Sequence, residues 1–241
     1  MSTNEPIWAR NEPAARRPRY TRDQIAAAAL AIADDEGIEA VSMRRVAAAL
    51  GAGTMTLYHY VRTKDDLLDL MDDTIMGEVL VPDGELAVGW RDALTQIATR
   101  SRDAFVRHPW ALEGLRDSRG GPNGMKHFEQ SLAAVSTLDL GFEEKLEIVL
   151  IVDDYVFGYV QRSSPRQSAS LTGDARVAAC EYLASLVATG RYPHTAAMFE
   201  GYEISDVFDR MVSAFRDPDR FAHGLARLLD GLEAHVGERG R

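Results

Sequence analysis

The fold is decided by the stretch MRRVAAALGAGTMTLYHY, residues 43–60. Ser42, directly before it, can cap a short helix over residues 43–50, because its hydroxyl accepts a hydrogen bond from a free backbone N–H. Gly51 then tolerates the positive φ that a sharp turn requires. A second short helix follows over residues 54–60. Two short helices joined by a tight glycine-containing turn predict a helix-turn-helix.

The helices on both sides of this motif have recognisable boundaries. Thr21 and Gln24 form the pattern of a capping box, which opens an alanine-rich helix that stops before Gly37. Thr63 can cap a further helix over residues 64–80, where apolar residues recur at helical spacing. The head of the molecule is therefore predicted to be a small helical module.

The rest of the chain is also predicted to be helical, and no segment has the alternation of a strand. The sequence thus predicts an all-α protein, with a flexible basic arm over residues 1–19, a head over 20–66 and a helical bundle over 67–238, linked through helix 64–80. Glycine and proline separate the bundle helices, which we expect at residues 90–108, 110–116, 124–138, 143–162, 174–189, 204–215 and 219–236.

Composition excludes several classes of protein. The chain has 241 residues, of which 46% are hydrophobic, so it can bury a sizeable core. It lacks the ~18 consecutive apolar residues of a membrane span and the apolar run of a signal peptide, so we expect a cytoplasmic protein with no membrane partner. Cys180 is the only cysteine and can form no disulfide within the chain. No metal or cofactor site is predicted.

The net charge of −10 is unevenly distributed along the chain. Residues 1–66 contain nine Lys and Arg and nine Asp and Glu, so the remainder of the chain holds the whole excess of acid. Many of the N-terminal cations flank the helix-turn-helix. They could neutralise phosphates while the acidic bundle stays away from the nucleic acid.

The second helix of the motif carries the groups that suit DNA recognition. With Leu57 turned to the core, it leaves hydroxyls, an imidazole and apolar edges for base edges, thymine methyls and phosphates. A lysine at a helix start is unfavourable for the helix dipole, so Lys64 is best explained by an external anion such as phosphate. A half-buried Tyr58 and a merely solvated Lys64 are the structural alternatives. The candidate residues of the second helix are Thr54, Thr56, Tyr58, His59 and Tyr60.

The pattern L-G-x(5)-L-Y-x(5)-K-x-x-L-L, over residues 50–68, resembles the DNA-binding domain of the tetracycline-repressor (TetR) family. Four downstream segments are similar to the C-terminal domain of the branch closest to the tetracycline repressor itself, so the resemblance covers about residues 20–236. They are GWRDAL (89–94), RHPW (107–110), GPNG (121–124) and FAHGLARLLDGL (221–232).

The resemblance implies roles for individual residues in binding double-stranded operator DNA. Tyr60 and Lys64 would contact phosphate, although many family members have His-Phe where this chain has Tyr60-Val61. The family also implies a homodimer through helices 143–162 and 219–236, reading a roughly palindromic operator. Each of these helices carries a wide apolar stripe. The stripes are Leu146, Val149, Leu150, Val156, Phe157 and Val160, interrupted by Asp153, and Phe221, Leu225, Leu228, Leu229 and Leu232. On position alone, either Arg44 or Arg45 could face the groove, and the resemblance favours Arg44. The residues that would face the groove are Arg44, Thr54, Thr56, Tyr58 and His59.

The bundle contains material for a small-molecule pocket, since apolar walls with few polar groups describe such a site. They also describe any helical core. By resemblance the ligand lies inside this bundle and helix 64–80 links it to the head; tetracycline itself is not implied, and an apolar or aromatic effector is expected. The candidates are Met71, Ile75, Trp90, Phe105, His108, Trp110, Met125, Phe128, Asp154, Tyr155 and Phe157, with His127 and Gln161 as further polar groups.

Two other functions compete with an effector-responsive repressor. A helix-turn-helix repressor that binds no small molecule would have the same head. A helical enzyme is disfavoured, because the sequence contains no H-x-x-x-H, C-x-x-C or G-x-S-x-G spacing and no phosphate-binding glycine loop, and we assign no catalytic residue.

Overall fold

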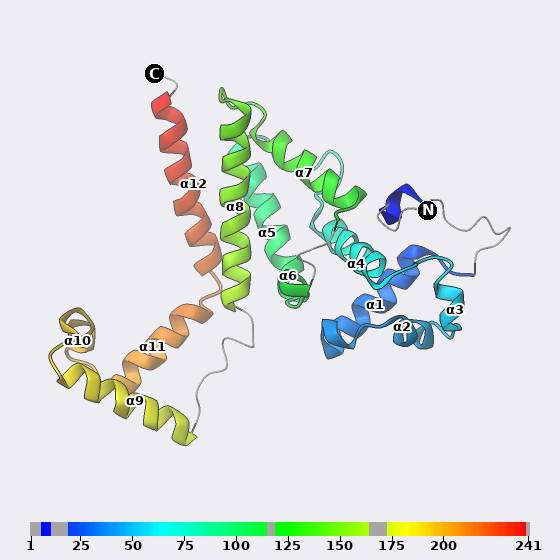
Figure 1. Cartoon of the computed structure of the whole chain (residues 1–241). Helices are drawn as coiled ribbons and strands as arrows, with labels where there is room; N and C mark the ends of the chain where they lie inside the picture. Colours follow the sequence, from blue (N-terminus) through cyan, green and yellow to red (C-terminus); the bar gives the residue numbers. More distant parts are fainter. Residues whose placement is uncertain (1–5, 11–18, 115–118, 164–172, 240–241) are drawn as a thin grey trace. The chain divides into compact units, whose positions relative to one another are not determined.

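The computed structural model describes residues 6–10, 19–114, 119–163 and 173–239, and within these ranges all regular elements are helical (Figure 1). The predicted all-α fold is confirmed. No helix in the described part of the chain is long and apolar enough to cross a membrane. The elements are η1 (Ile7–Ala9), α1 (Arg22–Glu36), η2 (Ile38–Ala40), α2 (Met43–Ala49), α3 (Thr54–Leu57), α4 (Lys64–Val79), α5 (Trp90–Arg107), α6 (Ala111–Gly114), α7 (Pro122–Val135), α8 (Phe142–Ser163), α9 (Gly173–Ala188), α10 (Pro193–Phe199), α11 (Ile204–Arg216) and α12 (Arg220–Arg239).

The helix starts follow the predicted caps. The Thr21 hydroxyl accepts a hydrogen bond from the Gln24 N–H (3.2 Å), and the Gln24 side chain accepts one from the Thr21 N–H (3.0 Å). Thr63 and Asp66 form a second capping box at the start of α4. Gly51 has φ +63°, the left-handed conformation that the turn between α2 and α3 needs. These local interactions form the helix-turn-helix.

Two local predictions, at α3 and at α10, differ from the structure. Helix α3 ends at Leu57 rather than at residue 60, because the Tyr60 and Val61 N–H groups both bond to the Leu57 carbonyl in a tight turn that buries the two side chains. Helix α10 was not predicted, since seven residues beginning with a proline give little periodicity. The last two residues of the expected helix 110–116 lie outside the described residues.

The predicted flexible arm is wrong for residues 6–10. They form a short 3₁₀ turn that packs against α4, and Ile7 is completely buried. Pattern reasoning failed there because a single buried isoleucine carries no periodicity. Residues 1–5 and 11–18 of the expected arm lie outside the described residues.

Two compact units divide the chain, residues 1–161 with 229–241, and residues 162–228. In the first unit α4 packs against α1 on one side and α5 and α7 on another (Figure 1). Leu67, Met71 and Ile75 of α4 are buried there. The head and the neighbouring bundle helices therefore share one core, and a domain boundary at residue 66 stays a prediction from sequence.

The second unit is built from α9, α10 and α11, which pack against one another. Arg176 of α9 pairs with Asp209 of α11 at 2.7 Å. No side chain of α9 or α10 is buried within the single chain. Large apolar side chains stay exposed on this unit, among them Val177, Tyr182, Met198, Tyr202 and Phe215.

The helices expected to form a dimer bury part of their apolar stripes within one chain. On α8, Val149, Val156 and Val160 are buried, whereas Leu150 and Phe157 are exposed. On α12, the predicted stripe likewise includes buried residues: Phe221, Leu225 and Leu229. The side chains that α8 leaves for a partner are thus fewer than the stripe predicted from sequence.

Replacing Asp153 of α8 should stabilise the protein in a pH-dependent way. Burial, with Asp154 beside it, raises the pKa of Asp153 to about 6. Since the pKa of an unfolded aspartate is about 4, ionisation lowers stability progressively as the pH rises from about 4 through 6. Asp153→Asn should therefore raise the free energy of unfolding by up to roughly 3 kcal/mol at pH 8 and little at pH 4.5.

Urea denaturation at both pH values and at a fixed protein concentration measures this difference. Asp139→Asn, at an exposed loop position, is the control and should be neutral at both. Equal stabilisation by Asp153→Asn at the two pH values would contradict the assigned cause.

Candidate nucleic-acid interface

Helix α3 and the two residues that follow it, Tyr58 and His59, carry most of the predicted DNA-reading groups. Leu57 is fully buried and fixes the orientation of the helix, so that Tyr58 and His59 are exposed and Thr54 and Thr56 are half-buried. Sequence reasoning missed Met55, whose side chain is 74% exposed in the middle of this helix. An apolar side chain at such a position suits the methyl group of thymine. A methionine in the middle of the second helix of the motif was therefore the signal in the sequence for a base contact.

The two arginines at the start of α2 are distinguished by an ion pair. The Arg45 guanidinium binds Glu36 at the end of α1 through both of its Nη atoms, one of them 2.8 Å from Oε2. Arg44 is exposed. The geometry therefore favours Arg44 as the cation available to DNA, as the family resemblance implied.

The two predicted phosphate contacts differ in exposure. Lys64 is exposed at the first position of α4, where its ammonium and the helix N-terminus can act on the same anion. Tyr60 is only 7% exposed and belongs mainly to the core of the head. Tyr60 therefore has little surface available for a phosphate.

The predicted ligand residues differ in how far they are buried. Met71, Ile75 and Phe105 are buried, Trp90 and Tyr155 are half-buried, and Met125, Phe128, Asp154 and Phe157 are exposed. The rings of Phe105 and Phe157 meet edge to face with centroids 5.3 Å apart, which brings α5 and α8 together. Burial lowers the pKa of the half-buried His127, so its imidazole is neutral at pH 7.

The remaining two ligand candidates have polar atoms that are engaged within the chain. His108 Nδ1 lies 2.7 Å from an Asp34 carboxylate oxygen and Nε2 lies 3.3 Å from Glu78. The Trp110 indole N–H donates to the same Asp34 oxygen at 2.8 Å. Asp34 is in α1, so these contacts tie the end of α5 to the head.

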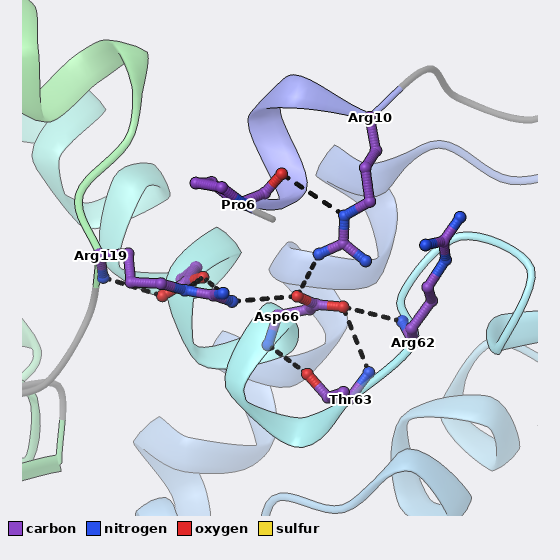
Figure 2. A network of polar contacts seen from close by, with 7 residues as sticks. Pro6, Arg10, Arg62, Thr63, Asp66 and Arg119 are labelled. Carbon is purple, nitrogen blue, oxygen red and sulfur yellow. Dashed lines mark hydrogen bonds and ion pairs between the residues drawn. The ribbon is translucent and has the colours of Figure 1, made fainter. Parts of the chain in front are cut away.

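Helix α4 carries a second buried face that is acidic. Asp66, Asp69 and Asp73 are each nearly fully buried. Asp66 accepts hydrogen bonds from the Arg62 and Thr63 N–H groups and pairs with Arg10 and Arg119, as Figure 2 shows.

The other two aspartates bind the segment that leads into α7. Asp69 accepts from the Arg119 N–H (2.9 Å) and Nε (2.8 Å). Asp73 accepts from the backbone N–H groups of Asn123 (2.8 Å) and Gly124 (3.1 Å), so it caps the N-terminus of α7 from another helix. The acidic face of α4 thus holds residues 119–124 in place.

These carboxylates differ in electrostatic state. Burial alone would raise the pKa of Asp66, but hydrogen bonds and charge from Arg10 and Arg119, with the Arg62 N–H, hold it below its usual value. Burial raises the pKa of Asp73, and the two N–H donors of α7 oppose this effect only in part. Asp66 is therefore the carboxylate in this cluster that is flanked by two arginines.

Sequence reasoning did not identify this cluster. The signal was the spacing of residues 66, 69 and 73, which puts three carboxylates on one side of a helix. On a helix such a row is usually a solvated face. The partners, Arg10 and Arg119, lie at least 50 residues along the chain from the aspartates that they bind and have no local relation to them.

A polar, exposed recognition helix in a helix-turn-helix, joined by one helix to a bundle, defines a DNA-binding transcription regulator. Residues 25–71 match the family of bacterial regulatory proteins called tetR, and residues 84–236 match the tetracyclin repressor-like C-terminal domain. The chain belongs to the TetR family of transcriptional regulators. Its membership agrees with the expectation that the chain is not an enzyme.

Individual relatives agree with this assignment. The HTH-type transcriptional repressor DrrR1 of Streptomyces coeruleorubidus is 37% identical over 230 residues, which cover 92% of this chain and 81% of that protein. The crystal structure of apo ActR from Streptomyces coelicolor superposes with a TM-score of 0.70 at 30% identity and covers 93% of this chain and all of ActR. ActR in complex with actinorhodin superposes with a TM-score of 0.69 at 27% identity, covering 92% and 100%.

Gly121→Ala should destabilise the α4 cluster. A Cβ at this position would meet the Asp73 carboxylate and, at 2.7 Å, the Trp8 ring. Because both neighbours are packed, we expect the free energy of unfolding to fall by roughly 1–3 kcal/mol in chemical denaturation.

The matched control is Gly124→Ala, three residues away in the first turn of α7, where the nearest atom is Met76 Cγ at 4.0 Å. Alanine there should be neutral or stabilising by up to ~1 kcal/mol. Equal stability of the two variants would argue against close packing around Gly121.

Proposed function

We propose that this TetR-family repressor binds a roughly palindromic operator as a homodimer and is released from it by a small, largely apolar or aromatic effector. The observation that carries the proposal is helix α4. Its apolar face joins the core of the head, and its acidic face binds residues 119–124 of the bundle. A displacement of that segment by an effector would therefore act directly on the helix that begins at Lys64.

We assign base reading and groove contact to Arg44, Thr54, Thr56, Tyr58 and His59, and phosphate contact to Lys64. The exposure of Arg44 and Lys64 supports these roles. Tyr60, which is largely buried, is assigned only a minor part in phosphate contact. A regulator of this kind acts on the chromosome, so we assign it to the cytoplasm.

The effector site is proposed in the bundle domain, residues 67–238. Its support is the aromatic contact of Phe105 with Phe157 and the fact that the similar protein ActR has been crystallised with actinorhodin. An effector acts only through its differential affinity for the two arrangements of the head. A ~100-fold loss of operator affinity requires about 2.7 kcal/mol of coupling.

Dimerisation is proposed through α8 and α12. Leu150 and Phe157 are exposed on α8 in the single chain, and burial of such side chains against a symmetry mate would stabilise a pair. The two heads would then read half-sites about one helical turn, ~34 Å, apart.

Substitutions in the head should separate positioning contacts from base reading. Lys64→Ala should weaken binding to all sequences and reduce the slope of log K against log salt by about 1.8, because each of the two subunits loses one phosphate contact worth about 0.9. Thr56→Ala should instead alter sequence preference at one position by about 1–3 kcal/mol. The probe is a duplex from the DNA upstream of the protein's own gene, narrowed by footprinting, and binding is followed by fluorescence anisotropy. Parent-like binding by both variants would refute the assignment of α3 and Lys64.

Thermal-shift screening with actinorhodin and a panel of apolar aromatic compounds tests the effector. A ligand that binds the folded protein at a hundred times its Kd stabilises it by about 2.7 kcal/mol, and the same compound should release the operator duplex. A repressor without an effector would show neither response across the panel.

A further inference from the structure

The N-terminal segment, residues 6–10, is docked on the side of α4 that binds the bundle. Ile7 is completely buried, and the 3₁₀ turn of η1 packs against α4. The ring of Trp8 lies so close to Gly121 that a Cβ at that position would meet it at 2.7 Å. The segment therefore contacts both α4 and the residues that precede α7.

Arg10 ends this segment with a charge that is used inside the protein. Its guanidinium pairs with Asp66, and its side chain is 10% exposed. Its Nε also donates to the Pro6 carbonyl at 3.4 Å, which closes the turn (Figure 2). A cation in this position has little surface left for a DNA phosphate.

Arg10 and Arg119 approach the same carboxylate oxygen of Asp66. The Arg119 Nη2 atom lies 3.0 Å from Asp66 Oδ1, the oxygen that Arg10 also binds. The other oxygen accepts the Arg62 and Thr63 N–H groups at 3.1 and 3.3 Å, and so closes the cap of α4. One buried carboxylate thus connects the N-terminal segment, the start of α4 and the segment before α7.

We propose that residues 6–10 are a strap that sets the position of the reading head, with Arg10 as a positioning residue for DNA binding and not a DNA contact. The strap holds the first turn of α4, where Lys64 lies two residues before Asp66, against residues 119–121. Without it, that turn samples more positions, and only a fraction of the molecules has the arrangement that fits the operator. The inference rests on the proposed function, because operator binding is its readout.

The test is Arg10→Gln, measured by anisotropy against the same operator duplex at several salt concentrations. We expect operator affinity about 3–10-fold weaker at each concentration, with the salt slope of the parent, because the competent fraction falls while the phosphate contacts stay. Lys64→Ala, measured beside it, should show the reduced slope of a direct contact.

Two further variants make the result specific. In a cycle with Asp66→Asn, which removes the shared anion, Arg10→Gln should cause no additional loss of affinity. Arg176→Gln breaks an arginine–aspartate pair in the other compact unit, where the arginine side chain is 33% exposed, and it should bind like the parent. Each variant is first shown to be folded at the temperature of the assay, and Arg10→Lys, which keeps the charge, should recover part of the affinity.

Several outcomes would overturn the strap. A salt slope that falls by about 1.8 in Arg10→Gln, which is about 0.9 for each subunit, would identify Arg10 as a direct phosphate contact. Unchanged or tighter binding, or full additivity with Asp66→Asn, would also contradict it. Failure of the parent to bind the duplex would count against the proposed function instead. In that case Trp8→Ala would be compared with the parent by amide hydrogen exchange of residues 119–124. No increase in the exchange rate there would refute the docking of residues 6–10 itself.

Discussion

The burial of three carboxylates on one side of α4 is the constraint on which the rest of this structure depends. An ionised aspartate out of water is costly unless hydrogen-bond donors or cations satisfy it. Asp66, Asp69 and Asp73 draw these groups from distant parts of the chain, namely Arg10, Arg119 and the first N–H groups of α7. The need to pair the buried carboxylates of α4 therefore determines where the N-terminal segment and the start of α7 lie.

The opposite side of α4 is apolar and lies in the core that the head shares with the neighbouring bundle helices. Because a helix moves as a rigid body, its two faces cannot respond independently. Under the proposed function, a displacement of residues 119–124 would be transmitted through α4 to the head. His108 contacts Asp34 of α1 and Glu78 of α4, so it connects the end of α5 to both of these helices. These contacts are direct physical links from α4 to α1 and to the segment that leads into α7.

Sequence could predict what local interactions determine. The capping boxes at Thr21 and Thr63 and the left-handed Gly51 follow from residues within a few positions of one another, and the helix boundaries there are correct. The end of α3 and the whole of α10 were mispredicted, because tight turns and very short helices have little periodicity. The aspartate cluster could not be predicted, since nothing near residues 66, 69 and 73 indicates that Arg10 and Arg119 will pair with the first two and that the start of α7 will bind the third.

The cap that α4 supplies to α7 has a consequence for local unfolding. Helix α7 begins with Gly121 and Pro122, which offer no side-chain cap, so its first turn relies on Asp73. If α4 withdraws, the first N–H groups of α7 lose their acceptor, and the turn frays into water. Repositioning the head would thus melt the first turn of α7. A rigid-body displacement would then be accompanied by local disorder, and the gain in chain entropy would contribute to the free-energy difference between the two arrangements of the head.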